Sequence, residues 1–342
     1  MKKRKSIFFL SFAVIAILVV FLIYRNIFGI TIDTGADGKE VFIPTGSTYE
    51  EVKYILDSEL DIRNPELFQL IAKKKNYPRH IKPGRYIVDT GISYPDLINM
   101  LRSGRQTPVN VTFNNVRTLY QLAGKVGGRI EADSAEIINF LTDGSNYASD
   151  GFKKETVIAV FLPNTYQMYW NTDAKSFYTR MVKEYNSFWN SQRQSRAREK
   201  GLDPVEVVTL ASIVDDEVAK VDEKPRIAGV YLNRLKKGMP LQACPTIKFA
   251  LNDFTITRVL KKHLVVDSPY NTYLHRGFPP GPVGCPSIEG IEAVLNAEDH
   301  DYLYFAAKSD FSGYHNFSKT LTEHNRYAVL YQKELNRRRI FK

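Results

Sequence analysis

The sequence predicts an α+β protein made of an N-terminal transmembrane helix, a small α+β module and a larger mixed α/β domain with loops rich in proline and glycine. Three observations lead to this prediction. Eighteen residues without a charge follow a basic N-terminus. A pattern of strand, Thr-Gly turn and helix then occurs twice. After residue 111, helical patterns alternate with Pro- and Gly-rich loops, which together indicate a second, larger domain.

Composition excludes several classes of protein. The chain has 342 residues, of which 44% are hydrophobic, so it is long and apolar enough for two folded domains. Its two cysteines cannot form the disulfide framework of a small secreted scaffold. No Cys-x-x-Cys or His-x-x-x-His spacing indicates a zinc site, and no glycine-rich phosphate loop is present. We therefore expect no metal and no cofactor.

The net charge of +10 is concentrated at the two ends of the chain. Residues 1–25 carry five cations and no acid, and residues 333–342 carry five cations and one acid. The body between these tails is nearly neutral. A protein that binds nucleic acid needs a basic face for the phosphates, so we expect no nucleic-acid partner.

The N-terminal charges flank a candidate membrane anchor. Lys2–Lys5 precede the uncharged run Ile7–Tyr24, and Arg25 follows it. As a helix this run spans about 27 Å, close to a hydrocarbon core of about 30 Å. The leading cations predict a cytoplasmic N-terminus and an exported body, hence a single-pass protein of the cytoplasmic (inner) membrane. The alternative is a cleaved signal peptide. We favour a retained anchor over residues 1–25, because the run is long and lacks an Ala-x-Ala-like cleavage site.

A short internal repeat opens the exported body. Residues 41–52 match residues 86–97 in their order of strand, Thr-Gly turn and helix. Each copy carries a side-chain pair with the spacing of a helix N-terminal capping box, Thr48 with Glu51 and Ser93 with Asp96. Strands separated by single helices over so short a length predict a small α+β module, placed at residues 26–110.

Within the remainder, residues 111–342, residues 114–200 are predicted to be mainly helical, and from Gly201 helices alternate with Pro- and Gly-rich loops and a strand. Asp203, Pro204 and Glu206 form a strong helix start, and Gly238 a helix end. The expected elements are helices over 133–141, 176–198, 204–220 and 225–237, a strand over 302–307 and a terminal helix from about Leu321.

One carboxylate on the helix 204–220 has an unusual position. At 100° per residue, Glu217 shares a face with the apolar residues Leu210, Ile213 and Val214, whereas Asp215 lies almost opposite. A carboxylate on an apolar face is expected to have a raised pKa, as a general acid requires. The alternative is a glutamate that marks the end of the buried face and reaches solvent, and the spacing does not decide between the two.

Two clusters combine neutral hydrogen-bonding groups with rings. One covers residues 268–273, and the other covers residues 315–320 with His324 and Asn325. Such side chains suit the hydroxyls, acetamido groups and ring faces of sugars, although for any one residue taken alone an ordinary turn is the favoured interpretation. A triad of Ser318, His324 and Asp301 is formally available, but no Gly-x-Ser-x-Gly elbow supports it.

Several motifs in a fixed order resemble one known family. They comprise Leu210–Glu217, Lys224–Leu235, Gly238–Thr246, Tyr270–Tyr273 and Gly277–Gly281. In this order they are similar to the endolytic murein transglycosylases of the MltG (YceG-like) family. The resemblance covers nearly the whole chain. It implies that residues 26–110 are a LysM-like module and residues 111–342 a YceG-like catalytic domain.

The resemblance also implies an activity. Family members cleave the β-1,4 bond between N-acetylmuramic acid (MurNAc) and N-acetylglucosamine (GlcNAc) in nascent peptidoglycan strands, and leave 1,6-anhydroMurNAc ends. The last carboxylate of the family's Glu-Lys-Glu segment falls on Glu217, which makes it the expected general acid/base. Here Asp215 and Asp216 replace the Glu and the Lys, so a negative neighbour should raise the pKa of Glu217 further.

The expected partners are peptidoglycan glycan strands and, at the membrane, peptidoglycan synthases. The candidate sugar-binding residues are Asn233, Gln242, Tyr270, Asn271, Tyr273, His315, Ser318, His324 and Asn325. Two alternatives stay open: a muramidase-type hydrolase that uses Asp215 or Asp216 as its second carboxylate, and a non-catalytic glycan-binding scaffold.

The two cysteines replace family residues in two loops of the catalytic part. Cys244 and Cys285 stand where the family usually has Asp and Asn. This paired replacement suggests a disulfide, which an exported domain permits in an oxidising compartment. The alternative is two free thiols, and a Cα separation beyond about 7 Å would exclude the bridge.

Overall fold

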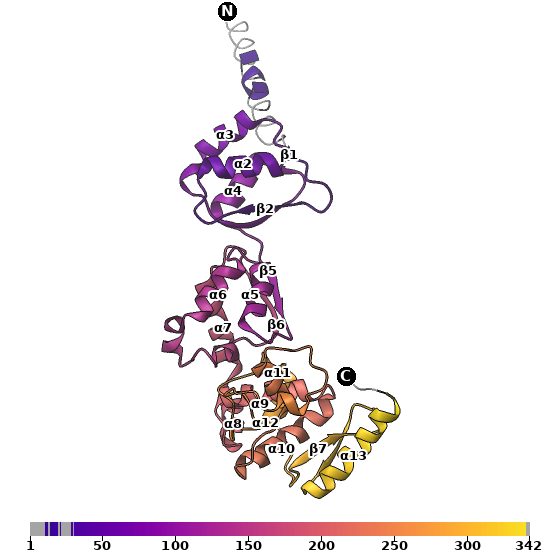
Figure 1. The fold of residues 1–342 in the computed structure, drawn as a ribbon. Coiled ribbons are helices and arrows are strands. Elements are labelled where there is room, and N and C mark those ends of the chain that lie inside the picture. The colour runs from indigo at the N-terminus through magenta and orange to yellow at the C-terminus, as the bar shows by residue number, and fades with distance from the viewer. Residues whose placement is uncertain (1–10, 13, 20, 22–28, 30, 340–342) are drawn as a thin grey trace, which may run out of the picture. The chain divides into compact units, whose positions relative to one another are not determined.

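The computed structural model describes residues 11–12, 14–19, 21, 29 and 31–339 and has a mixed α+β fold (Figure 1). The described residues contain four two-stranded sheets, in which β1 pairs with β4, β2 with β3, β5 with β6 and β7 with β8. The chain divides into two compact units. One comprises residues 1–111, 129–132 and 167–173, and the other comprises residues 112–128, 133–166 and 174–342.

The predicted anchor, Ile7–Tyr24, lies largely outside the described residues. Within the part that is described, none of the helices has the length and apolar character needed to cross a membrane.

In the first unit, the sequence repeat is also a structural pair. Strand β2 (Lys39–Ile43) pairs antiparallel with β3 (Gly84–Val88), and Val41 lies directly opposite Tyr86, the residue to which the repeat aligns it. The capping box of Thr48 and Glu51 begins α2, and Ser93 caps α4 by accepting from the Asp96 amide. The remaining bounds are β1 Thr31–Ile32, α2 Tyr49–Glu59, α3 Pro65–Lys74, β4 Ile92–Ser93 and α4 Tyr94–Ser103.

The second unit begins with helices around the β5–β6 pair. The helix predicted over 176–198 is two helices, because the Asn190 side chain accepts a hydrogen bond from the Arg193 amide and starts a new helix there. The first elements of the second unit are β5 Val109–Phe113 (which starts in the first unit), α5 Leu119–Gly127, α6 Ser134–Thr142, β6 Asn164–Met168 (which ends in the first unit), α7 Ala174–Phe188 and α8 Ser191–Glu199.

Helix α9 (Pro204–Glu217) is the centre of the second unit. Its predicted start at Asp203, Pro204 and Glu206 is confirmed, with Asp203 and Glu206 forming a capping box, and every residue from Val207 to Val214 is buried. The helix ends at Glu217 and not at Lys220, because Val218 is extended. Around α9 lie α10 (Lys224–Lys236), α11 (Cys244–Ala250) and α12 (Ile288–Leu295).

The C-terminal elements of this unit pack beside α10. They are β7 Tyr304–Ala307, β8 His315–Ser318 and α13 Leu321–Arg337, which lies along both strands (Figure 1). Short 3-10 helices occur at Tyr77–Arg79, Gly144–Asn146, Ala148–Asp150, Val157–Val160, Val221–Glu223 and Lys261–His263.

Candidate functional site

Glu217, the last residue of α9, lies half-buried in a cavity of about 290 Å³, here called the Glu217 cavity. Side chains from α10, α11, β7, α13 and two loops meet there. The lining residues besides Glu217 are Tyr231, Arg234, Leu241, Gln242, Cys244, Tyr273, Tyr304, Phe305, Leu321 and His324.

The carboxyl group of Glu217 has two hydrogen-bond partners, and both reach the same oxygen. The Tyr231 hydroxyl donates to Oε1 over 3.1 Å, and the Cys244 backbone N–H donates to Oε1 over 3.1 Å. Burial raises the pKa of Glu217 to about 7, against the opposing effect of these two hydrogen bonds. The charge of Asp216 raises this pKa further, as expected, but less than burial does.

A carboxyl group with this pKa can act in both protonation states near neutral pH. Its acid form can give a proton to a leaving oxygen, and its carboxylate can take one back. The cavity beside it supplies room for a substrate and several polar side chains.

Arg234 organises one wall of the Glu217 cavity. Its guanidinium is buried and donates to the carbonyl oxygens of Pro240 and Leu303 and to Gln242 Oε1, at 3.0, 3.2 and 2.5 Å. Gln242 itself has a φ of 54°, a strained value for a residue other than glycine. The His324 ring stacks on Tyr304, and its pKa is lowered by burial and by the charge of Arg234.

Three of the predicted sugar-binding residues, Gln242, Tyr273 and His324, line the Glu217 cavity. Tyr273 Oη lies 3.4 Å from Cys244 Sγ, so the two groups share one side of the cavity.

The other predictions in the 233–271 region do not line the cavity. Asn233 donates to the carbonyl oxygens of His300 and Tyr302 and joins α10 to the segment before β7. Tyr270 packs on Phe249, with ring centroids 4.6 Å apart. Asn271 is fully buried and holds its own loop by donating to Leu264 and Val266 carbonyls and accepting from the Tyr273 amide. The amide groups of Asn233 and Asn271 therefore hold the local backbone.

His315, Ser318 and Asn325 also lie outside the lining of this cavity. His315 bonds to the Glu223 carboxylate through its backbone N–H and through Nδ1. Ser318 is fully buried in β8 and Asn325 is exposed on α13. The triad that the sequence allowed is absent, since neither Ser318 Oγ nor His324 Nδ1 has a hydrogen-bond partner and Asp301 pairs with Lys319 on the surface.

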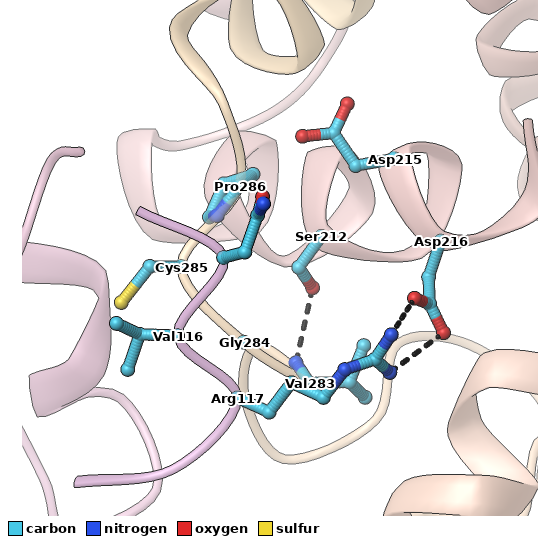
Figure 2. A pocket seen from close by; sticks show the side chains of 10 residues that line it. Val116, Arg117, Ser212, Asp215, Asp216, Val283, Gly284, Cys285 and Pro286 are labelled. Carbon is cyan, nitrogen blue, oxygen red and sulfur yellow. Dashed lines mark hydrogen bonds and ion pairs between the residues drawn. The ribbon is translucent and has the colours of Figure 1, made fainter. Parts of the chain in front are cut away.

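A second pocket, here called the Arg117 pocket, lies against another face of α9 (Figure 2). It has a volume of about 250 Å³ and is lined by Asp215 and Asp216, whose side chains point away from each other. Asp216 forms a two-pronged ion pair with Arg117, at 3.0 and 2.5 Å. Asp215 pairs with Lys224 at 2.7 Å and accepts from the Ser287 amide at the start of α12. Both carboxylates therefore form ion pairs and lie outside the Glu217 cavity.

The predicted disulfide is not formed, and both cysteines are free thiols. Cys244 lines the Glu217 cavity, whereas Cys285 lines the Arg117 pocket with its Sγ 3.8 Å from the Ile158 carbonyl oxygen. Burial raises the pKa of Cys244, and it raises the pKa of Cys285 to about 12. Within the described residues, no group of three or more His, Cys, Asp or Glu side chains could hold a metal ion.

Sequence reasoning missed four polar or aromatic residues of the cavity wall: Tyr231, Arg234, Tyr304 and Phe305. Tyr231 and Arg234 are three residues apart on α10 and therefore share a helix face, which the sequence does show. Their convergence on Glu217 depends on how α10 packs against α9, and no local pattern indicates that.

The chain is similar to known proteins of one family. Residues 41–329 match the model of the YceG-like family. The chain is 30% identical over 310 residues to an endolytic murein transglycosylase of Bacillus subtilis (strain 168), covering 86% of this chain and 85% of the relative.

Two further comparisons agree. An endolytic murein transglycosylase of Streptococcus pneumoniae (serotype 2, strain D39) is 30% identical over 298 residues, which are 78% of this chain and 54% of that longer relative. A crystal structure of a YceG-like protein from Listeria monocytogenes superposes with a TM-score of 0.56 at 28% identity and covers 85% of this chain and 99% of the other.

Proposed function

Because the chain belongs to the YceG-like family, we propose that it is a peptidoglycan lytic transglycosylase in which Glu217 is the general acid and base. The bond cleaved is the β-1,4 linkage between MurNAc and GlcNAc within glycan strands, and the product carries a 1,6-anhydroMurNAc end. The B. subtilis and S. pneumoniae relatives, both named endolytic murein transglycosylases, support this activity.

The observation that carries the proposal is the state of Glu217. Burial raises its pKa to about 7, and it faces a cavity lined by polar and aromatic side chains. Its protonated form donates to the leaving glycosidic oxygen as an oxocarbenium-like transition state forms. The resulting carboxylate then accepts the proton of the muramic C6 hydroxyl while that oxygen attacks C1. No water is consumed, because the nucleophile belongs to the substrate.

One carboxylate suffices for this reaction, whereas a hydrolase of the muramidase type normally uses two, about 5–9.5 Å apart. Asp215 and Asp216 pair with Lys224 and Arg117 and line the Arg117 pocket, outside the Glu217 cavity. Their placement argues against a role as the second carboxylate.

The residues proposed to hold the sugar are Gln242, Tyr273 and His324, because these line the Glu217 cavity. Their amide, phenol and neutral imidazole can hydrogen-bond hydroxyl and acetamido groups, and the Tyr273 ring can pack on a sugar face.

The remaining parts of the chain locate the enzyme. The proposed anchor at residues 1–25 holds the exported body at the outer surface of the cytoplasmic membrane, near strands leaving the peptidoglycan synthases. Residues 26–110 are proposed as a LysM-like module and residues 111–342 as the catalytic domain. The compact unit that ends its main segment at Val111 supports this division.

The test is mass spectrometry of glycan fragments released from peptidoglycan by the purified exported part. A lytic transglycosylase releases fragments one water lighter than hydrolytic products. Fragments with reducing ends would instead indicate a hydrolase. Binding of glycan without any cleavage would indicate a scaffold.

A further inference from the structure

We infer that Tyr231 is a positioning residue which, together with the Cys244 backbone N–H, holds Glu217 Oε1 as the non-reacting oxygen, so that Oε2 alone gives and takes the catalytic proton. This inference rests on the proposed function and goes beyond it, because it divides the work between the two oxygens of one carboxyl group.

The geometry makes the two oxygens unequal. Oε1 accepts two hydrogen bonds of 3.1 Å, one from the Tyr231 hydroxyl and one from the Cys244 N–H. No hydrogen bond from any described residue reaches Oε2. A backbone N–H can only donate, so Oε1 must accept in both protonation states. With both lone pairs of Oε1 engaged, the proton of the neutral acid resides on Oε2.

Tyr231 is built to stay in place as a donor. Its side chain is 1% exposed on α10, and its ring packs edge-on against Phe305 with centroids 5.8 Å apart. Burial and the neighbouring Glu217 raise the pKa of Tyr231 well above its usual value, so its hydroxyl keeps its proton throughout the working pH range.

The same atom, Glu217 Oε2, then gives the proton and takes one back. In the first step the Oε2–H bond breaks, the proton goes to the glycosidic oxygen and the C1–O4 bond breaks. The charge left on the carboxylate is stabilised by the two donors on Oε1. In the second step Oε2 takes the proton of the C6 hydroxyl as the O6–C1 bond forms. Oε2 is protonated again, and no co-reactant is needed.

The first test is the pH profile of kcat/KM for Tyr231→Phe. Removal of the hydroxyl is expected to lower kcat by about 10- to 100-fold, because a hydrogen bond to the developing carboxylate is lost. This hydrogen bond lowers the pKa of Glu217, so the alkaline limb of the profile should also move to higher pH. Tyr178→Phe is the matched control, since it removes a tyrosine hydroxyl that donates to the Asp150 carboxylate over 2.9 Å, outside the Glu217 cavity. The control should leave the limb unmoved.

A second pair of variants tests the other donor and does not depend on the folding of Tyr231→Phe. Cys244→Ala removes the thiol and keeps the N–H, whereas Cys244→Pro removes both. Proline is compatible with this position, because Cys244 is the first residue of α11 and Ala243 before it is extended, with ψ 124°. Cys244→Pro should move the alkaline limb to higher pH relative to Cys244→Ala.

The outcomes separate this inference from the proposed function. If Glu217→Gln stays fully active, Glu217 is not the acid and both ideas fail. If Glu217→Gln is inactive but neither Tyr231→Phe nor Cys244→Pro moves the alkaline limb upward, only the assignment of the two oxygens is overturned.

Discussion

Arg117 and Asp216 form a two-pronged ion pair that joins the segment before α5 to the last turn of α9, next to Glu217 (Figure 2). The guanidinium also lies over the Phe254 ring, 4.9 Å from its centroid. The residue next to Glu217 in the sequence is thus an acid. The cation that pairs with Asp216, Arg117, comes from a distant part of the sequence.

The first prediction concerns this charge. Arg117→Met leaves Asp216 without its cation, and the charge of Asp216 raises the pKa of Glu217. The general acid must be protonated, so activity is lost as pH rises through the pKa of Glu217. Because Arg117→Met should raise this pKa, the alkaline limb of the variant's profile should lie at higher pH than that of the unmodified protein. The kcat/KM profile of Arg117→Met beside Arg117→Lys checks this. An unmoved limb, or one shifted to lower pH, would show that Arg117 does not control the charge near Glu217.

The second prediction concerns the buried pair of Asp215 and Lys224. Their side chains are 18% and 9% exposed, and Gly290 leaves the room that the Asp215 carboxylate occupies. Lys224→Met leaves the largely buried Asp215 carboxylate without its cation and should lower the free energy of unfolding by about 2–4 kcal/mol. Lys319→Met breaks the exposed pair with Asp301 and should cost less than about 1 kcal/mol. Urea unfolding measures both, and equal losses would contradict a structural role for the buried pair.

The third prediction concerns the thiols. Because Cys244 and Cys285 are free, unfolded protein alkylated without reductant should gain two adducts by intact mass. In the folded protein Cys285 should react slowly, since it is 7% exposed and burial raises the pKa of its thiol to about 12. A protein two mass units lighter that takes up no alkylating agent would establish a bridge instead.

Local signals in the sequence predicted much of the fold. The capping box of Asp203 and Glu206 starts α9 where expected, and the strands of the repeat at residues 41–52 and 86–97 pair with each other, antiparallel. These features depend on hydrogen bonds within a few residues or on periodicity. The helix end at Glu217 and the break at Asn190 were missed, because each is decided by the backbone conformation of one residue.

The candidate site was predictable only in part. Helical periodicity placed Glu217 on the apolar face of α9, and in the structure it lies half-buried at the end of that helix. Asn233 and Asn271 carry the right chemistry for a sugar, but their amides are used to hold backbone carbonyls. Which polar side chains line the cavity depends on long-range packing, so residue type alone could not separate Asn233 and Asn271 from Gln242 and Tyr273.

The disulfide prediction failed for the same reason. It rested on the paired replacement of family residues in two loops of the catalytic part, yet Cys244 lines the Glu217 cavity and Cys285 lines the Arg117 pocket. Each thiol has its own neighbour, Tyr273 Oη for Cys244 and the Ile158 carbonyl for Cys285.

The central claim is that Glu217 is the acid and base of a transglycosylase. The most direct measurement is the rate at which 1,6-anhydroMurNAc ends are released from peptidoglycan by the unmodified protein, by Glu217→Gln and by the control Glu184→Gln, whose side chain pairs with Arg180 on α7. We expect Glu217→Gln to lose at least about 100-fold in rate with unchanged thermal stability, and Glu184→Gln to keep the full rate. Release of anhydro ends by Glu217→Gln at the unmodified rate would contradict the account.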